Sequence, residues 1–103
     1  MSNNFFPLTA EELFNRINKI PKVKLAMLPT SLEYLPNMSK ELEINLYIKR
    51  DDCTALAFGG NKTRHLEFIM AKAVSGDYDC ILTGAASQSN WCRQAVAAAN
   101  KLN

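Results

Sequence analysis

A lysine that follows two glycines and an asparagine is the strongest candidate for a reactive side chain in this sequence. The stretch reads Phe58-Gly59-Gly60-Asn61-Lys62-Thr63-Arg64. Glycines permit a backbone with positive φ and a close approach to another group. Lys62 then falls in the first turn of a predicted helix, where the positive end of the helix dipole disfavours the ammonium form. Because only a neutral amine attacks a carbonyl carbon, this position favours a lysine that forms a Schiff base.

Two other interpretations of this stretch stay open. A lysine on a helix is most often a solvated surface residue, although the flanking glycines and Asn61 argue against that here. A glycine loop at a helix N-terminus can also bind phosphate. The spacing, however, matches neither GxxxxGK[ST] nor GxGxxG, so phosphate binding is the weaker alternative.

The segment 84–90 is a second loop of small and polar residues. It ends in Ser87, Gln88, Ser89 and Asn90, which offer two hydroxyls and two amides at the start of a predicted helix. Together with backbone N–H groups, such side chains can hold a carboxylate or a phenolate oxygen. On spacing alone, an ordinary Ser/Asn helix cap is an equally good interpretation.

Periodic patterns place both loops between a strand and a helix. Alternating apolar residues predict a strand over 43–50, and a helix over 62–74 follows, with Asn61 as its N-cap. A short apolar strand at Cys80–Thr83 is of the kind buried in parallel sheets, and an alanine-rich helix over 90–102 follows it. The apolar face of the first of these helices comprises Leu66, Ile69, Met70, Ala73 and Val74. This order predicts an α/β fold with parallel strands, in which both loops lie where open sheets bind ligands.

The first forty residues carry weaker signals. Thr9 and Glu12 form a capping box for a helix over 10–18. Prolines at positions 21, 29 and 36 disfavour helix across the stretch 22–37, and within it Leu28–Glu33 is predicted to be an extended arm. A turn or a short helical bend is expected at Asn37–Lys40.

The composition limits the classes of protein and partner. The chain has 103 residues with a net charge of +2, which suits one small domain or a piece of a larger one and gives no basic patch for nucleic acid. No apolar run approaches a membrane span, and residues 1–7 do not form a signal peptide. The three cysteines, Cys53, Cys80 and Cys92, lack CxxC spacing and fit reduced thiols in the cytoplasm. His65 has no partner at ligand spacing, so we expect no metal site.

Two separated motifs resemble those of the pyridoxal-phosphate enzymes that include 1-aminocyclopropane-1-carboxylate deaminase, D-cysteine desulfhydrase and L-cysteate sulfo-lyase. Residues 48–52 and 56–64 resemble the lysine motif of this group, and residues 28–36 resemble the arm before it. The sequence Gln88-Ser89-Asn90, with Arg93-Gln94, resembles the second signature, usually QSNHxRQ. The resemblance runs from about Leu8 to the end of the chain. It implies a tryptophan synthase β-like, fold type II architecture, a three-layer α/β fold with parallel strands that is incomplete here.

The resemblance also implies roles for the residues of both loops. Lys62 would bind pyridoxal 5′-phosphate through a Schiff base and then move the substrate's proton. Asn90 would hydrogen-bond the phenolic oxygen of the cofactor, and His65 would lie near its phosphate. Ser89, with Gln88, Asn90 and neighbouring amides, would hold the carboxylate of a small amino acid. β-Elimination from a cysteine-like substrate would then release pyruvate, ammonia and sulfide.

The sequence departs from the group at several positions. Trp91 replaces the usual histidine, so we expect the substrate side of the pocket to differ. His65 stands where a second lysine is common, and it would supply a weaker, pH-dependent charge. Ala55 stands where glycine is common.

The resemblance further predicts the domain organisation. Residues 1–61 would form the arm and first strand of the large domain, residues 62–103 would begin the small domain, and the remainder of both would be absent. We therefore expect an N-terminal part of a desulfhydrase or deaminase that is weakly folded and catalytically poor alone, with a homodimer or a missing C-terminal part as partner. The alternative is a truncated, non-catalytic α/β fragment or interaction subunit with exposed apolar edges.

Overall fold

The computed structural model describes residues 8–103, and its regular elements are short except for two helices near the C-terminus. In chain order they are α1 (Ala10–Ile17), β1 (Leu32–Tyr34), α2 (Pro36–Leu42), β2 (Tyr47–Lys49), α3 (Lys62–Ser75) and α4 (Asn90–Lys101). Two 3-10 turns, Asp51–Cys53 and Leu56–Phe58, lie between β2 and α3. No helix within residues 8–103 is long and apolar enough to cross a membrane. Residues 1–7, for which the sequence predicts no signal peptide, lie outside the described part.

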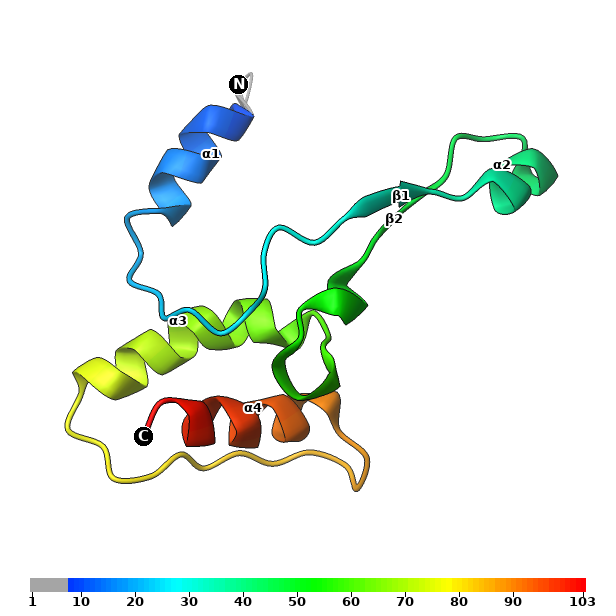
Figure 1. The fold of residues 1–103 in the computed structure, drawn as a ribbon. Helices are drawn as coiled ribbons and strands as arrows, with labels where there is room; N and C mark the ends of the chain where they lie inside the picture. Colours follow the sequence, from blue (N-terminus) through cyan, green and yellow to red (C-terminus); the bar gives the residue numbers. More distant parts are fainter. Residues whose placement is uncertain (1–7) are drawn as a thin grey trace, which may run out of the picture.

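Helix α1 forms where the capping box predicts it. The Thr9 hydroxyl accepts a hydrogen bond from the backbone N–H of Glu12 at 3.2 Å, and the Glu12 carboxylate accepts one from the backbone N–H of Thr9 at 2.8 Å. This reciprocal pair satisfies donors that a helix start otherwise leaves free. The apolar side chains of α1, including Phe14, are nevertheless exposed, and Figure 1 shows the helix standing apart from α3 and α4.

The strand predicted over 43–50 is confirmed only in part, because β2 covers three residues of it. It pairs antiparallel with β1, and Leu32 lies opposite Lys49. Pro29 and Pro36 flank β1. Because proline cannot donate a hydrogen bond to a strand ladder, the ribbon stays short. Between the two strands, where a turn or a short helical bend is expected, the chain forms the short helix α2, which has Pro36 in its first turn.

One buried carboxylate attaches residues 22–31, the chain before β1 that is called the arm from here on, to α3. The Glu67 side chain, 6% exposed, accepts hydrogen bonds from the backbone N–H groups of Leu25 at 3.0 Å and Ala26 at 2.9 Å. The backbone carbonyl of Glu67 accepts a third from Val23. Buried N–H groups of an extended segment need such acceptors when no neighbouring strand supplies them. The arm can therefore place Leu25 in the core.

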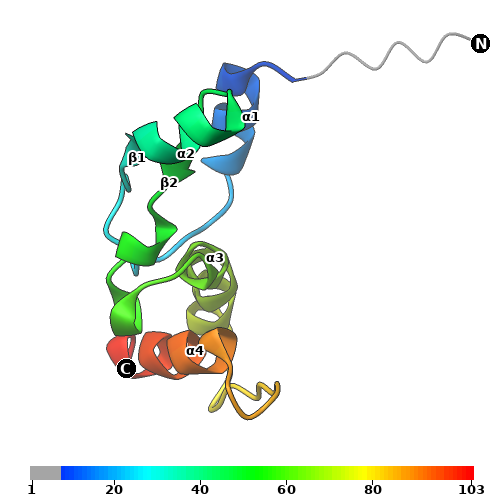
Figure 2. The same ribbon diagram turned by 90° about the vertical axis from the view of Figure 1, so that its right-hand side faces the viewer.

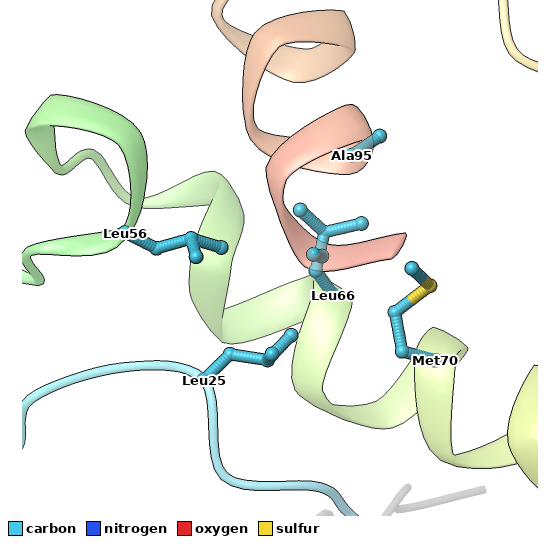
Figure 3. Packing of buried hydrophobic residues seen from close by; sticks show 6 residues of the cluster. Leu25, Leu56, Leu66, Met70 and Ala95 are labelled. Atoms are coloured by element: carbon cyan, nitrogen blue, oxygen red, sulfur yellow. The ribbon is translucent and has the colours of Figure 1, made fainter. Parts of the chain in front are cut away.

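Helices α3 and α4 match the predicted helices 62–74 and 90–102. They pack against each other, and in Figure 1 both begin on the same side of the pair, whereas Figure 2 shows that α4 crosses α3 at an angle. Figure 3 shows the core between them and the arm. The buried apolar residues of this cluster are Leu25, Leu56, Leu66, Met70, Ala95 and Ala98.

The apolar face predicted for α3 is only partly buried. Leu66 and Met70 are buried, whereas Ile69 and Val74 are exposed. The buried stripe instead includes Thr63 and Glu67, because these polar side chains bond to α4 and to the arm. The helix therefore packs along a face rotated from the one that apolarity alone predicts.

The prediction of a strand at Cys80–Thr83 is wrong for residues 8–103. The segment returns the chain from the end of α3 to the start of α4 as irregular backbone (Figure 1). Its residue Leu82 is 95% exposed. A strand forms by pairing its N–H and C=O groups with a neighbour, and the described part of the chain provides no neighbour here. The single sheet of this part is the antiparallel β1–β2 ribbon, so no parallel pairing is observed in it.

An ion pair joins the 3-10 turn after β2 to the first turn of α3. Arg64 donates to both carboxylate oxygens of Asp51, each at 2.8 Å, and the Thr30 hydroxyl donates to the same carboxylate at 2.9 Å. The hydrogen bonds from Arg64, helped by that from Thr30, lower the pKa of Asp51 from 3.8 to about 2. Bidentate pairing of this kind fixes the relative orientation of the two segments.

We expect the replacement of Glu67 by alanine to lower the free energy of unfolding by about 2–4 kcal/mol, because two buried N–H groups lose their acceptor. Urea denaturation followed by circular dichroism measures this loss. The control is Glu41→Ala on the exposed surface of α2, which should change stability by less than about 0.5 kcal/mol. Equal losses in the two variants would contradict the role assigned to Glu67.

The pKa of Asp51 gives a prediction for acid conditions. Because the folded-state pKa lies below 3.8, the carboxylate stabilises the fold fully above about pH 4, and this contribution is lost as the pH falls toward 2. Arg64→Gln removes the main cause, so the Asp51 carboxyl should titrate close to 3.8 in a carbon-detected NMR titration. Arg16→Gln on exposed α1 is the control and should leave the midpoint at about 2. An unchanged midpoint in the Arg64 variant would show that the pair does not form.

Candidate functional site

The glycine loop before α3 adopts a backbone that requires its glycines. Gly59 has φ of 76° and Gly60 has φ of 132°, and a Cβ on Gly59 would lie 1.8 Å from the carbonyl oxygen of Asp52. A Cβ on Gly60 would lie 2.4 Å from the side-chain nitrogen of Gln94, which is buried and has no room to move. The prediction that these glycines permit positive φ and a close approach is confirmed.

Non-glycine residues of the same loop are also in the left-handed region. Ala55, Ala57 and Phe58 have φ values of 73°, 45° and 66°. This region favours glycine, which explains why glycine is common at the position of Ala55 in the group that the chain resembles. Strained backbone of this kind clusters at functional sites, where surrounding contacts hold it in place.

A buried amide joins the glycine loop to both helices. Gln94, with no exposed surface, donates from its side-chain nitrogen to the carbonyl oxygen of Gly59 at 3.1 Å. Its side-chain oxygen accepts from the hydroxyl of Thr63 at 2.6 Å. The Thr54 hydroxyl accepts a hydrogen bond from the N–H of Gly60 and donates one to its C=O. The loop is thus held at the start of α3 and against α4.

Lys62 is the first residue of α3, as the sequence predicts. It is half-buried, and its amine makes no hydrogen bond or ion pair with the residues that the structure describes. Asn61 precedes the helix, but its side chain makes no capping hydrogen bond, contrary to expectation, because its backbone is already helical. The glycine loop, rather than an asparagine cap, therefore positions the lysine.

The second loop brings its polar side chains to the start of α4. Ser89 caps the helix, with its hydroxyl oxygen accepting from the backbone N–H of Cys92 at 3.1 Å, which confirms the helix-cap interpretation for this residue. Its own hydroxyl proton remains available to a second partner. The side-chain oxygen of the exposed Asn90 accepts from Gln88 and from Arg93, each at 3.3 Å.

His65 and Trp91 take no part in these hydrogen bonds among the described residues. His65 is exposed on α3, one turn beyond Lys62. Trp91 packs partly against the core, and its indole N–H donates to the Thr83 hydroxyl at 2.7 Å. The residue that replaces the usual histidine therefore stabilises the connection between the helices.

Sequence reasoning assigned no role to Thr54, Thr63, Arg93 or Gln94. Arg93 donates to the carbonyl oxygen of Gly59 at 3.3 Å and so joins the two loops directly. The sequence does hold a signal for Gln94, because this amide lies four residues before Ala98 and next to Ala95 on the alanine-rich helix. Both alanines are buried in the structure. A polar residue on a buried face needs a hydrogen-bond partner, although the sequence does not say which.

We expect Gln94→Ala to lower the free energy of unfolding by about 2–4 kcal/mol, because the Thr63 hydroxyl and the Gly59 carbonyl lose a buried partner. Urea denaturation measures the change. Asn100→Ala, exposed on the same helix, is the matched control and should shift stability by less than about 0.5 kcal/mol. A stable Gln94 variant would mean that the amide does not hold the loop.

Comparison with known proteins matches this arrangement to one enzyme family. The model of the family described as pyridoxal-phosphate dependent enzyme matches residues 23–103. A D-cysteine desulfhydrase of Salmonella paratyphi C (strain RKS4594) is 48% identical over 88 residues, which cover 85% of this chain and 27% of that protein. The D-cysteine desulfhydrase of Salmonella newport (strain SL254) is 47% identical over the same length.

A solved structure has the same fold. The crystal structure of an ACC deaminase homologue superposes with a TM-score of 0.84 and 40% sequence identity, over 91% of this chain and 29% of that one. The prediction of a partial fold type II architecture is thereby confirmed, although residues 8–103 show none of its parallel strand pairing. The chain spans under a third of the length of these relatives. On the family match over residues 23–103, the chain belongs to the pyridoxal-phosphate-dependent enzymes.

Proposed function

We propose that this chain supplies the lysine-bearing part of a pyridoxal-phosphate site that acts on a small amino acid. The main support is that α3 and α4, which begin at Lys62 and Asn90, start on the same side of the helix pair (Figure 1). Gln94 and Arg93 both donate to the carbonyl oxygen of Gly59 and thus couple the two loops. The names of the relatives favour a D-cysteine desulfhydrase-like lyase or a deaminase.

The residues of both loops fit the cofactor. The Lys62 amine has no carboxylate partner among residues 8–103, so it is free to bond to the aldehyde carbon of a cofactor. Two helices that begin at the same end also turn the positive ends of their dipoles toward an anionic ligand. Asn90 is exposed at this end with its amide nitrogen unused by the described residues, which suits the phenolic oxygen.

Each residue has a proposed task in β-elimination. Pyridoxal phosphate, when bound, supplies the electron sink for charge that develops at the substrate's α-carbon. Lys62 would bind the cofactor and take the proton from the α-carbon of the substrate. Ser89 and Gln88, with Asn90, would hold the substrate carboxylate, and His65 would serve the cofactor phosphate. Loss of sulfide from the β-carbon, followed by hydrolysis with one water, gives pyruvate and ammonia from D-cysteine.

The rest of the site is proposed to come from further protein, either a second copy or a C-terminal part. The Cα radius of gyration is 17.7 Å, whereas a compact domain of this size has about 13 Å. Phe58, directly before the two glycines, and Leu82, in the segment that connects α3 to α4, are each 95% exposed. In this proposal residues 1–61 belong to the large domain and residues 62–103 begin the small one. The same exposed side chains favour the second candidate, a non-catalytic interaction subunit.

We further propose a cytoplasmic location and no nucleic-acid or membrane partner. The three cysteines are free thiols, which suits a reducing compartment. The net charge of +2 and the scattered basic residues offer no footprint for polyanions.

Labelling of Lys62 tests the proposed function. Pyridoxal phosphate added to the chain should give a visible absorbance band, and borohydride reduction should fix the label on Lys62, as located by mass spectrometry. Lys62→Ala should abolish the band and the label. Lys72→Ala, exposed on the same helix, is the control and should retain both. A label on other lysines only, or one that persists in the Lys62 variant, would favour the non-catalytic candidate.

A further inference from the structure

Arg93 contacts both loops of the site through one nitrogen. Its Nη2 atom donates to the carbonyl oxygen of Gly59 and to the side-chain oxygen of Asn90, each at 3.3 Å. Its other terminal nitrogen, Nη1, is buried and has no hydrogen-bond partner among the residues that the structure describes. A buried N–H without a partner disfavours the folded state, so this side chain is not placed for stability alone.

The contact with Arg93 determines which way the amide of Asn90 faces. A guanidinium group donates hydrogen bonds and cannot accept them, so the atom of Asn90 that faces it must be the oxygen Oδ1. Gln88 donates to the same oxygen at 3.3 Å, which fills its two lone pairs. The nitrogen Nδ2 therefore points away from both donors, and it makes no hydrogen bond within residues 8–103.

We propose that Arg93 is a positioning residue that holds Asn90 with Nδ2 toward the cofactor and fixes the distance between Asn90 and the loop that precedes Lys62. A phenolate oxygen binds a donor and is repelled by a carbonyl oxygen, so a flipped amide would weaken cofactor binding. The same guanidinium group bonds Gly59, three residues before Lys62, and therefore couples the two cofactor contacts. The inference rests on the proposed function, because it assigns the partner of Asn90.

A double-mutant cycle on cofactor affinity tests this role. Titration of the chain with pyridoxal phosphate, followed by absorbance, should show about tenfold weaker binding for Arg93→Met and for Asn90→Ala. Because Arg93 acts through Asn90, the double variant should also be weaker by about tenfold, and not by about a hundredfold. Arg16→Met on exposed α1 controls for the loss of a cation and should bind as the wild type does. Independent losses that multiply in the double variant would overturn the proposal.

Asn90→Asp tests the amide orientation without touching Arg93. The carboxylate keeps an oxygen for Arg93 and Gln88 but has no N–H for the cofactor. We expect about tenfold weaker cofactor binding with an unchanged or raised urea midpoint, so this arm remains decisive if Arg93→Met fails to fold. Arg93→Lys, which still donates, should recover part of the affinity. Wild-type affinity in Asn90→Asp would overturn the orientation.

NMR of the chain without cofactor separates the two proposals. The side-chain amide of Asn90 should be more mobile in Arg93→Met than in the wild type, as measured by nitrogen relaxation. If the wild type takes up no cofactor on Lys62, the proposed function is wrong, and this measurement still decides whether Arg93 holds Asn90. An Asn90 amide equally rigid in both proteins would overturn the positioning role.

Discussion

The buried side-chain amide of Gln94 is the group on which the arrangement of both loops depends. An amide offers a donor and an acceptor in one rigid plane, and here the donor bonds the carbonyl of Gly59 while the acceptor bonds the hydroxyl of Thr63. Both bonds form only if α4 lies directly beside the start of α3. The close approach in turn leaves no space for a Cβ on Gly60. The position of α4, the backbone of the loop and the start of α3 are therefore mutually dependent.

This dependence explains how a small chain can hold Lys62 at a defined position. The loop before Lys62 contains several residues with positive φ, and such a backbone persists only when surrounding contacts hold it. Gln94 and Thr54 both supply such contacts, and the Asp51–Arg64 pair holds the 3-10 turn before the loop against α3. This polar network fixes the backbone position of Lys62, because the apolar cluster between α3, α4 and the arm is small.

The parts of the fold that the sequence predicted well are those with local causes. The capping box at Thr9 specifies α1 because its hydrogen bonds span three residues. Helices α3 and α4 follow from periodicity, and Lys62 and Ser89 fall at their starts as expected. The prediction of a strand at Cys80–Thr83 was wrong, because a strand needs a neighbouring strand that the hydrophobic pattern of one segment cannot guarantee. The ribbon was missed for the same reason, since β1 looks like an arm until β2 pairs with it.

The sequence by itself therefore determined the helices, the two loops at their starts and the residues whose chemistry suits a pyridoxal-phosphate site. Those features depend on neighbours a few residues away or on motifs that can be read along the chain. Only the tertiary structure decided that Gln94 and Arg93 join the loops, which way Asn90 faces and that Glu67 receives the arm. Gln94 and Glu67 each bond to residues more than thirty positions away in the sequence. Tertiary packing decides which of the many possible partners each buried side chain meets.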